Sequence, residues 1–286
     1  MPEKCKLCPR ECGIDRSVKT GRCGVSDEIR LARVGLHAWE EPCLSYGAGS
    51  GTVFFSGCVL GCVFCQNHEI SRGKKGYPVS VQTLADEFLR LQEMGAVNIN
   101  LVTPTQYTDK ILLALDKAKP RLSIPVVYNC GGYEKPETIR ALAGKVDIYL
   151  PDLKYTDSKL ALQLSAAPYY FPTAAAAIRE MVQQVGAPQW EGEKLKSGVV
   201  IRHLILPGQV ENSLKALDWI GEHFRPGEVL VSLMRQYTPM GGLPAPYDRR
   251  ITDEEYDAVL SWMYLNDLEG FTQEAEAADK GFIPDF

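Results

Sequence analysis

The fold is decided by one stretch of the chain, Ser56-Gly57-Cys58-Val59-Leu60-Gly61-Cys62-Val63-Phe64-Cys65-Gln66-Asn67. Its three cysteines can bind three irons of a [4Fe–4S] cube. The fourth iron then lacks a protein ligand and can be chelated by a small molecule, whereas a fully ligated cluster only carries electrons. The glycines at positions 57 and 61 suit a loop that curls closely around a cluster. The stretch therefore predicts a reaction site on iron at Cys58, Cys62 and Cys65.

A zinc ion is the alternative interpretation of these cysteines. Zinc would need a fourth ligand from elsewhere in the chain, such as Cys43. Structural zinc sites usually offer paired Cys-x2-Cys arms, however, and this favours the iron–sulfur cluster.

Length and composition limit the class of protein. A chain of 286 residues fits one barrel-type domain with a small appendage. Its 31 basic and 36 acidic residues give a net charge of -5, so no basic field indicates nucleic-acid binding. Nine cysteines are an odd count and a poor disulfide scaffold in a chain of this length. We find no signal peptide and no run long enough for a membrane span, and we expect a reducing cytoplasm.

The chain divides into three predicted parts. Residues 1–47 form a metal-binding segment that holds five of the nine cysteines, residues 48–240 form the barrel, and residues 241–286 form a helical C-terminal extension. The predicted strands are apolar runs at 52–56, 97–102, 125–129, 146–150, 199–206 and 229–233. The predicted helices are amphipathic stretches at 81–94, 109–119, 135–142, 173–185, 213–222 and 252–265. Residues 155–172 and 189–197 are expected to be connections, and 239–246 a surface linker.

Six strand–helix units predict an α/β fold, a (β/α)6 partial TIM barrel. A doubly wound open sheet is the alternative, because alternation alone does not separate the two. Polar groups follow every predicted strand, as expected where function gathers at the carboxyl ends of barrel strands. These groups are the cysteine loop, Thr103-Pro104-Thr105, Asn129-Cys130-Gly131-Gly132, Asp152-Leu153-Lys154, Pro207-Gly208 and Gln236-Tyr237. Such a ring around one mouth favours the barrel.

Other motifs of the chain carry a family resemblance. They are Cys65-Gln66-Asn67, Asp152-Leu153-Lys154, and Val200-Ile201-Arg202-His203 leading to Leu206-Pro207-Gly208. With the cysteine spacing, they resemble the radical S-adenosylmethionine (SAM) enzymes of the pyruvate formate-lyase activating enzyme group. Uncharacterised homologues of that enzyme are especially similar, since they begin with a segment like Cys5-Lys6-Leu7-Cys8-Pro9-Arg10-Glu11-Cys12-Gly13. A partial barrel is the common architecture of these enzymes.

One position departs from the activating enzymes. They carry a Gly-Gly-Glu motif after the second strand, which holds the amino group of SAM. Here Val102-Thr103-Pro104-Thr105-Gln106 stands in its place. The amino group would then be held by backbone carbonyls or by Thr103 and Thr105.

The resemblance implies a reaction and its partners. SAM would chelate the open iron through its amino nitrogen and carboxylate, and an electron from the reduced cluster would cleave it. The resulting 5′-deoxyadenosyl radical abstracts hydrogen from the substrate, while the protein orients SAM and excludes water. The resemblance also implies an electron donor such as flavodoxin or ferredoxin.

Four residues of the ring are the main candidates for binding SAM. Lys154 and Arg202 are cations suited to the methionyl carboxylate, and by resemblance Lys154 is the stronger candidate. Asp152 and Asn129 can hydrogen-bond the ribose hydroxyls or the methionyl amino group. Alternatively, Asp152 and Lys154 only pair at the rim, and Asn129 caps its own glycine turn.

Three more polar residues are given roles on weaker chemical grounds. Asn67 either assists SAM or holds the cysteine loop, and Gln236 aligns with a SAM-contacting region of the family. His203 alternates away from Arg202 on its strand and is predicted to be a hydrogen-bonded packing residue.

The N-terminal cysteines predict a second metal site. Cys5, Cys8, Cys12 and Cys23 supply four soft ligands to a segment that has little core of its own. A structural zinc ion or an auxiliary iron–sulfur cluster would staple it, and a cluster could also relay electrons. Cys130, like Cys43, is interpreted as a small packed residue.

These observations favour a radical SAM oxidoreductase whose target could be a glycyl residue of a partner enzyme. The aromatic run Tyr169-Tyr170-Phe171 is a candidate docking surface for such a protein substrate, although three aromatics in a row are more often lid or packing material. A small molecule, a free amino acid or RNA is the alternative target. The non-enzyme alternative is an iron–sulfur electron-transfer protein, in which the triad takes a fourth cysteine.

Overall fold

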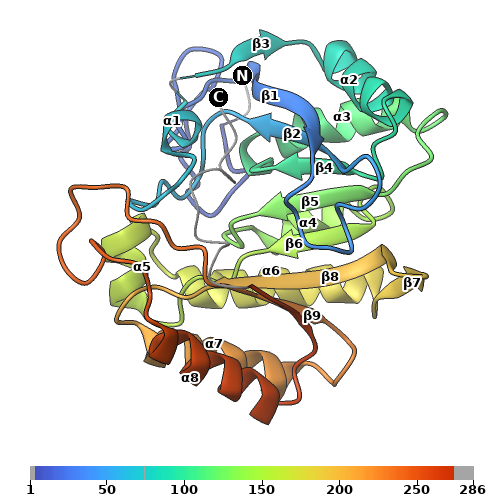
Figure 1. The fold of residues 1–286 in the computed structure, drawn as a ribbon. Coiled ribbons are helices and arrows are strands. Elements are labelled where there is room, and N and C mark those ends of the chain that lie inside the picture. The colour runs from blue at the N-terminus through green and yellow to red at the C-terminus, as the bar shows by residue number, and fades with distance from the viewer. Residues whose placement is uncertain (1–3, 74, 274–286) are drawn as a thin grey trace.

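The protein folds around one long, mixed β-sheet (Figure 1). The structure is a computed structural model that describes residues 4–73 and 75–273. Its strands are β1 (Ile29–His37), β2 (Ser50–Phe55), β3 (Tyr77–Val79), β4 (Ile99–Val102), β5 (Val126–Cys130), β6 (Ile148–Pro151), β7 (Gln189–Glu191), β8 (Lys194–Leu204), β9 (Leu230–Met234) and β10 (Gly270–Thr272).

Helices connect and cover these strands. They are α1 (His68–Ser71), α2 (Val81–Glu93), α3 (Thr108–Ala118) after a short 3₁₀ turn η1 (Thr105–Tyr107), α4 (Pro136–Ala141), α5 (Ser158–Ser165), α6 (Tyr170–Val185), α7 (Val210–His223) and α8 (Asp253–Leu265). Local sequence sets several of their ends. The Ser80 side chain caps α2, Pro136 opens α4, and Thr252 with Glu255 forms a capping box on α8. Every helix in the described part of the chain is too short or too polar to cross a lipid bilayer.

The strand order decides between the two predicted architectures. The parallel strands β2, β4, β5, β6, β8 and β9 lie side by side in chain order, with β10 added in parallel beyond β9. A doubly wound sheet would reverse its strand order at a switch point, and this sheet does not. The order runs as a line rather than a ring, so the barrel is open. The predicted partial barrel is confirmed, and the doubly wound alternative is wrong.

The sheet separates two apolar regions. The larger core packs the outward side chains of the strands against the helices; for example, Leu101 of β4 packs with Ile111 of α3. A second cluster lies on the other face and contains Cys43, Val127, Ile148 and Val200. Because residues alternate along a strand, the polar side chains at Asn129, Asp152 and Arg202 continue this inner face toward the carboxyl ends of the strands.

Several local expectations differ from the structure. Residues 155–172 are not only a connection, because α5 forms there with the Asp157 side chain accepting from the Leu160 amide. Residues 189–197 form the β7–β8 hairpin rather than a loop. The C-terminal extension is not purely helical, since β10 joins the sheet, and residues 274–286 lie outside the described residues. At the other end, β1 lies within the predicted N-terminal segment yet pairs antiparallel with β2.

Candidate active site

The cysteine triad lies in the loop that joins β2 to α1, at the carboxyl end of the first parallel strand. Cys62 is buried, and Cys58 and Cys65 are half-buried. The three thiols interact electrostatically with one another, so the loop does bring them together. Gly57 and Gly61 both adopt positive φ, +82° and +73°, as the tight loop requires.

Hydrogen-bond donors surround the sulfurs. The Leu60 amide donates to Cys58 Sγ at 3.4 Å, and the Ser165 hydroxyl donates to Cys62 Sγ at 2.8 Å. The Asn67 amide and the Ser71 side chain lie beside Cys65. Donors of this kind stabilise thiolates and tune the potential of a cluster.

Without a bound metal, burial is the main cause of the shifted pKa values of the Cys58 and Cys65 thiols. It raises the pKa of Cys65 to about 12, and the neighbouring thiols add to that rise. Burial likewise raises the pKa of Cys58, with Cys62 as the next cause. A coordinated metal reverses this balance, because its charge deprotonates a thiol outright.

In the described part of the chain, neither Cys43 nor Cys130 is placed as a fourth ligand of the triad. Cys43 packs among Val127, Ile148 and Val200 in the inner cluster, and Cys130 is buried beside Glu134. Within residues 4–73 and 75–273, no three His, Cys, Asp or Glu side chains are arranged to share one metal ion. A cube needs no such arrangement, since each thiolate binds a different iron. The donor set of three thiols therefore fits a cluster with an open corner better than it fits zinc.

Four of the predicted SAM-binding residues form one network on the inner face. Arg202 donates from Nε to Asp152 Oδ1 at 2.9 Å and from Nη2 to Asn129 Oδ1 at 2.6 Å. Lys154 Nζ donates to the other carboxylate oxygen of Asp152 at 2.5 Å. The predicted pairing of Asp152 with Lys154 is thus present, and Arg202 extends it to the end of β5.

Charge within the network is balanced locally. Burial raises the pKa of the Asp152 carboxyl, but Arg202 and Lys154 outweigh burial and hold that pKa below its usual value. Burial lowers the pKa of Lys154, while Asp152 and then Cys62 raise it, and the net pKa is raised. Lys154 is therefore a cation beside the triad, with side-chain exposure of 15%.

Tyr170 is a site residue that the sequence does not identify. Its hydroxyl accepts from the Lys154 amide at 3.0 Å and lies 2.8 Å from the Asp152 carbonyl and 2.9 Å from the Gly131 carbonyl. Tyr170 is fully buried, so the docking surface expected at residues 169–171 is reduced to Tyr169, which is 78% exposed. The only signal for Tyr170 in the sequence is the aromatic run itself.

The loop after β4 replaces the missing acidic motif with an unusual backbone. Thr103 has φ of +58°, a conformation that a β-branched residue rarely adopts. Its carbonyl accepts from Gln106 Nε2 at 2.8 Å, and the same nitrogen donates to the Ser56 and Gly57 carbonyls that precede the triad. Gln106, which no sequence signal identifies, therefore fastens this loop to the cysteine loop.

Thr105 points away from the network. Its hydroxyl donates to the buried Glu134 carboxyl at 2.5 Å. Burial raises the pKa of Glu134 to about 8, so this carboxyl is largely protonated at neutral pH. The structure brings Thr103 to the mouth and leaves Thr105 in the core.

The remaining predicted residues lie at the edges of the site. The Gln236 carbonyl accepts from Gln66 Nε2 at 2.8 Å, which brings the end of β9 to the cysteine loop. Asn67 begins α1 without a side-chain cap. His203 is buried and bonded to the Leu153 carbonyl and the Ser213 hydroxyl, as its interpretation as a packing residue requires.

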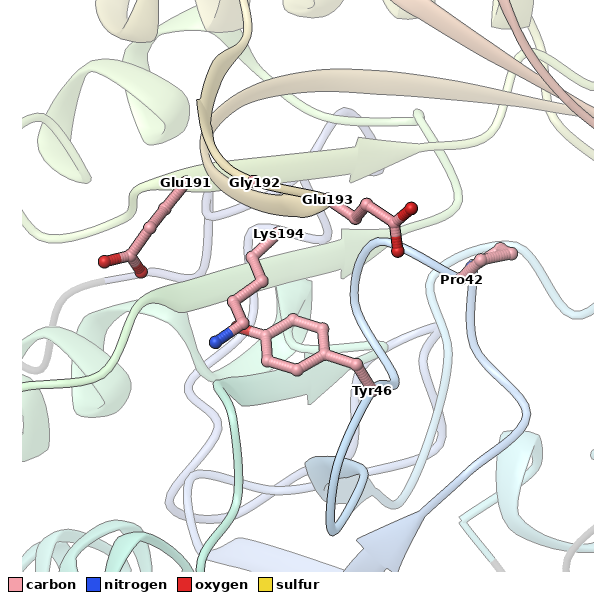
Figure 2. A pocket seen from close by; sticks show the side chains of 6 residues that line it. All are labelled: Pro42, Tyr46, Glu191, Gly192, Glu193 and Lys194. Atoms are coloured by element: carbon pink, nitrogen blue, oxygen red, sulfur yellow. The ribbon is translucent and has the colours of Figure 1, made fainter.

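A surface hollow lies at the opposite end of the sheet (Figure 2). Its lining residues are Pro42, Tyr46, Glu191, Gly192, Glu193 and Lys194. The β7–β8 hairpin and the loop before β2 place it at the amino ends of the parallel strands. It takes no part in the site.

An open parallel barrel with a three-cysteine loop after its first parallel strand defines a class of iron–sulfur enzyme. Residues 52–220 match the sequence profile of the Radical SAM superfamily, more than half of the chain. The protein belongs to that superfamily, which implies a [4Fe–4S] cluster and SAM.

The chain is also similar to individual known proteins. The uncharacterized protein MJ0674 of Methanocaldococcus jannaschii is 28% identical over 270 residues, which are 90% of this chain and 73% of that protein. A radical SAM methyltransferase from Sphaerobacter thermophilus matches with a TM-score of 0.52 at 16% identity, covering 78% of this chain and 66% of that one. Streptococcus suis SuiB bound to its precursor peptide SuiA matches with a TM-score of 0.53 at 15% identity; the match covers 77% of this chain and 47% of SuiB. At these identities the two structures show a shared fold.

Proposed function

We propose that this chain is a SAM-cleaving oxidoreductase that abstracts a hydrogen atom from its substrate. Cys58, Cys62 and Cys65 would hold the cluster. When bound, the reduced cluster gives one electron to the sulfonium of SAM, which releases methionine and a 5′-deoxyadenosyl radical. The observation that carries the proposal is the position of Lys154, a partly buried cation that interacts with the Cys58 and Cys62 thiols.

The inner network would orient SAM at the open iron. Lys154 is suited to the methionyl carboxylate, because a partly buried ammonium makes strong charge-assisted hydrogen bonds. Asp152 holds Lys154 and Arg202 in place, and Tyr170 fixes the backbone at Asp152 and Lys154. Asn129 and Gln236 would contact the nucleoside.

The SAM amino group would be held by backbone carbonyls near Thr103. Three features support this: the loop lacks an acidic side chain, Thr103 holds a strained φ of +58°, and Gln106 fixes its peptide. Strain that the surroundings maintain in this way often marks a functional position. Asn67 would hold the cysteine loop rather than SAM, because its backbone amide donates to the Cys65 thiol.

A glycyl residue of a partner enzyme is one proposed target. The support is the resemblance to activating enzymes and the exposed Tyr169 beside the mouth. A protein donor such as flavodoxin or ferredoxin would supply the electrons, and a reducing cytoplasm would protect the cluster.

A small polar molecule is the second candidate substrate, and the barrel interior favours it. Asn100 on β4 is fully buried, its side chain lies beside the Glu40 carboxyl, and among the described residues its amide oxygen has no hydrogen-bond donor. Glu41 Oε2 is also buried without one, and Glu40 and Glu41 both interact with Arg202. Native proteins rarely leave such atoms unsatisfied, so a ligand or water would complete them.

Product analysis tests the proposed activity. Anaerobically reconstituted protein with dithionite and SAM should release 5′-deoxyadenosine and methionine in equal amounts. Intact cluster without cleavage would contradict the proposal. Asn100→Ala separates the two substrates: for an interior ligand it should slow turnover with the substrate but leave uncoupled SAM cleavage unchanged, whereas a glycyl-loop substrate would be modified at the same rate.

A further inference from the structure

The four N-terminal cysteines are folded into one compact site. Backbone hydrogen bonds loop the chain back on itself, from the Cys5 amide to the Ile14 carbonyl at 2.8 Å and from the Gly13 amide to the Cys5 carbonyl at 3.0 Å. A methyl group built on Gly21 would lie 3.3 Å from Cys23 Sγ and 3.7 Å from Cys12 Sγ, so these two sulfurs face one point. Cys8 interacts electrostatically with both, and Cys5 with Cys23.

The segment has little regular structure of its own. Residues 4–28 contain no helix and no strand, and they are held mainly by Arg10 and Arg16, which donate to the Val59 and Gln106 carbonyls. Clustered thiolates in such a segment commonly bind a metal that stabilises it. These features favour a metal centre over four independent thiols.

The segment is joined directly to the catalytic loop. The Cys58 amide donates to the Cys23 carbonyl at 3.1 Å, so one hydrogen bond connects a ligand of each group. Arg10, between Cys8 and Cys12, donates to the Val59 carbonyl at 2.8 Å. The two centres are therefore neighbours, separated by backbone rather than by solvent.

The neighbouring catalytic centre favours a cluster over zinc at this site. The triad belongs to a family that implies a [4Fe–4S] cube, and a hydrogen bond joins Cys58 to Cys23. The N-terminal group has one cysteine more than the triad, so it can close every corner of a cube and carry electrons.

The positive charge of the N-terminal segment favours the docking of an acidic electron-donor protein. Residues 4–23 carry six basic side chains against Glu11 and Asp15, in a chain with net charge -5. Lys4, Lys6, Lys19 and Arg22 are exposed. A patch of one sign steers an oppositely charged protein to its surface.

We propose that Cys5, Cys8, Cys12 and Cys23 bind a second [4Fe–4S] cluster that passes electrons from an acidic one-electron carrier protein to the triad's cluster. Each transfer oxidises the carrier by one electron, reduces the second cluster, and then reoxidises it as the triad's cluster is reduced. The relay rests on the proposed function, because SAM cleavage consumes that electron.

Metal analysis of a triad-free chain tests the second cluster without SAM. The triple variant Cys58→Ala, Cys62→Ala, Cys65→Ala should retain about four irons and four sulfides per chain, and the wild type about eight. One zinc per triad-free chain, or no metal at all, would overturn the proposal. A failure of SAM cleavage would leave this result unaffected, so the two proposals fail separately.

Donor dependence tests the relay. In Cys8→Ala with Cys23→Ala, the rate of SAM cleavage with reduced flavodoxin should fall at least about fivefold more than the rate with dithionite. Equal rates, or equal losses, with both reductants would overturn the relay proposal.

A charge-reversal variant tests the relay without removing a cluster ligand. Lys6→Glu with Lys19→Glu should raise the KM for flavodoxin at unchanged iron content. Lys117→Glu in the last turn of α3 is the control and should leave the KM unchanged; an unchanged KM in the double variant would count against the basic patch as the docking site.

Discussion

The chain carries two cysteine groups that touch through one hydrogen bond and have different surroundings. The triad lies at the carboxyl end of a buried parallel strand, beside the Asp152–Lys154–Arg202 network. The N-terminal group lies in a segment without helix or strand, where the charged pair beside the cysteines is Glu11 with Lys135. Three thiolates leave one iron open for chemistry, whereas four close the cluster and limit it to electron transfer. The difference suggests that ligand number, together with the groups that face the cluster, separates a catalytic centre from a relay.

The largest expected effect follows loss of a triad ligand. Cys62→Ala should abolish 5′-deoxyadenosine formation, a loss greater than the roughly 100-fold that removal of an outer partner causes. Product release under dithionite measures it. Cys43→Ala is the matched control, since Cys43 packs in the inner cluster away from the triad, and it should retain activity. Loss of activity in Cys43→Ala alone would mean that the ligand set is misassigned.

Removing the shared carboxylate should have the next largest effect. Asp152→Asn leaves Arg202 and Lys154 without their counter-charge, which costs about 3 kcal/mol of unfolding free energy for a buried pair. The KM for SAM should rise at least about tenfold, because the Lys154 ammonium is no longer positioned. Asp116→Asn, an exposed carboxylate paired with Lys145, is the control and should change stability by under about 1 kcal/mol. Similar effects of the two variants would contradict the assigned role of Asp152.

A methyl group at Gly57 should disturb the contact between the N-terminal cysteine group and the triad. Its Cβ would lie 2.7 Å from the Cys23 carbonyl and 2.8 Å from a Val25 methyl, at φ of +82°. Gly227→Ala carries the same backbone penalty of about 1–2 kcal/mol at φ of +78°, but its Cβ meets nothing within 4 Å. Gly57→Ala should therefore lose more thermal stability and more iron than Gly227→Ala. Equal losses would show that the two groups are not packed as described.

The smallest effect is a pH dependence at His203. Burial lowers its pKa to about 4 in the folded state from about 6.5 in the unfolded state. The unfolded chain therefore takes up a proton below pH 6.5 that the folded chain refuses, and stability falls as the pH drops toward 4. Between pH 7.5 and 5.5 the His203 contribution to this loss should be about 1 kcal/mol, measured by guanidinium unfolding as the difference between the wild type and His203→Gln. Ser213→Ala keeps the imidazole and should keep the wild-type slope; equal slopes in the wild type and His203→Gln would contradict the assignment.

Sequence patterns predicted the parallel core well because its strands are covered on both faces. Strands β2, β4, β5, β6, β8 and β9 appear as apolar runs, and their predicted ranges overlap the observed ones. Strand β1, which lies between β2 and the short edge strand β3, mixes Arg30, Arg33 and His37 with apolar residues, and it was missed for that reason. The short α5 was missed because its eight residues carry little periodicity.

The sequence predicts the site only where its residues form a motif of neighbouring positions. The cysteine spacing and the Asp152-Leu153-Lys154 motif indicate ligands without any fold. Tyr170 and Gln106 act through contacts with residues 18 and 50 positions away, which no local pattern encodes. The positive φ of Thr103 is likewise imposed by its surroundings, since its side chain disfavours it.

The most direct test of the open-iron account is the EPR spectrum of the reduced triad cluster in the Cys8→Ala, Cys23→Ala variant, titrated with SAM. The account predicts a shifted spectrum that saturates at one SAM per chain, with hyperfine coupling when the SAM amino nitrogen is ¹⁵N-labelled. An unchanged spectrum from an intact four-iron cluster would mean that the fourth iron is already ligated, and would contradict the account.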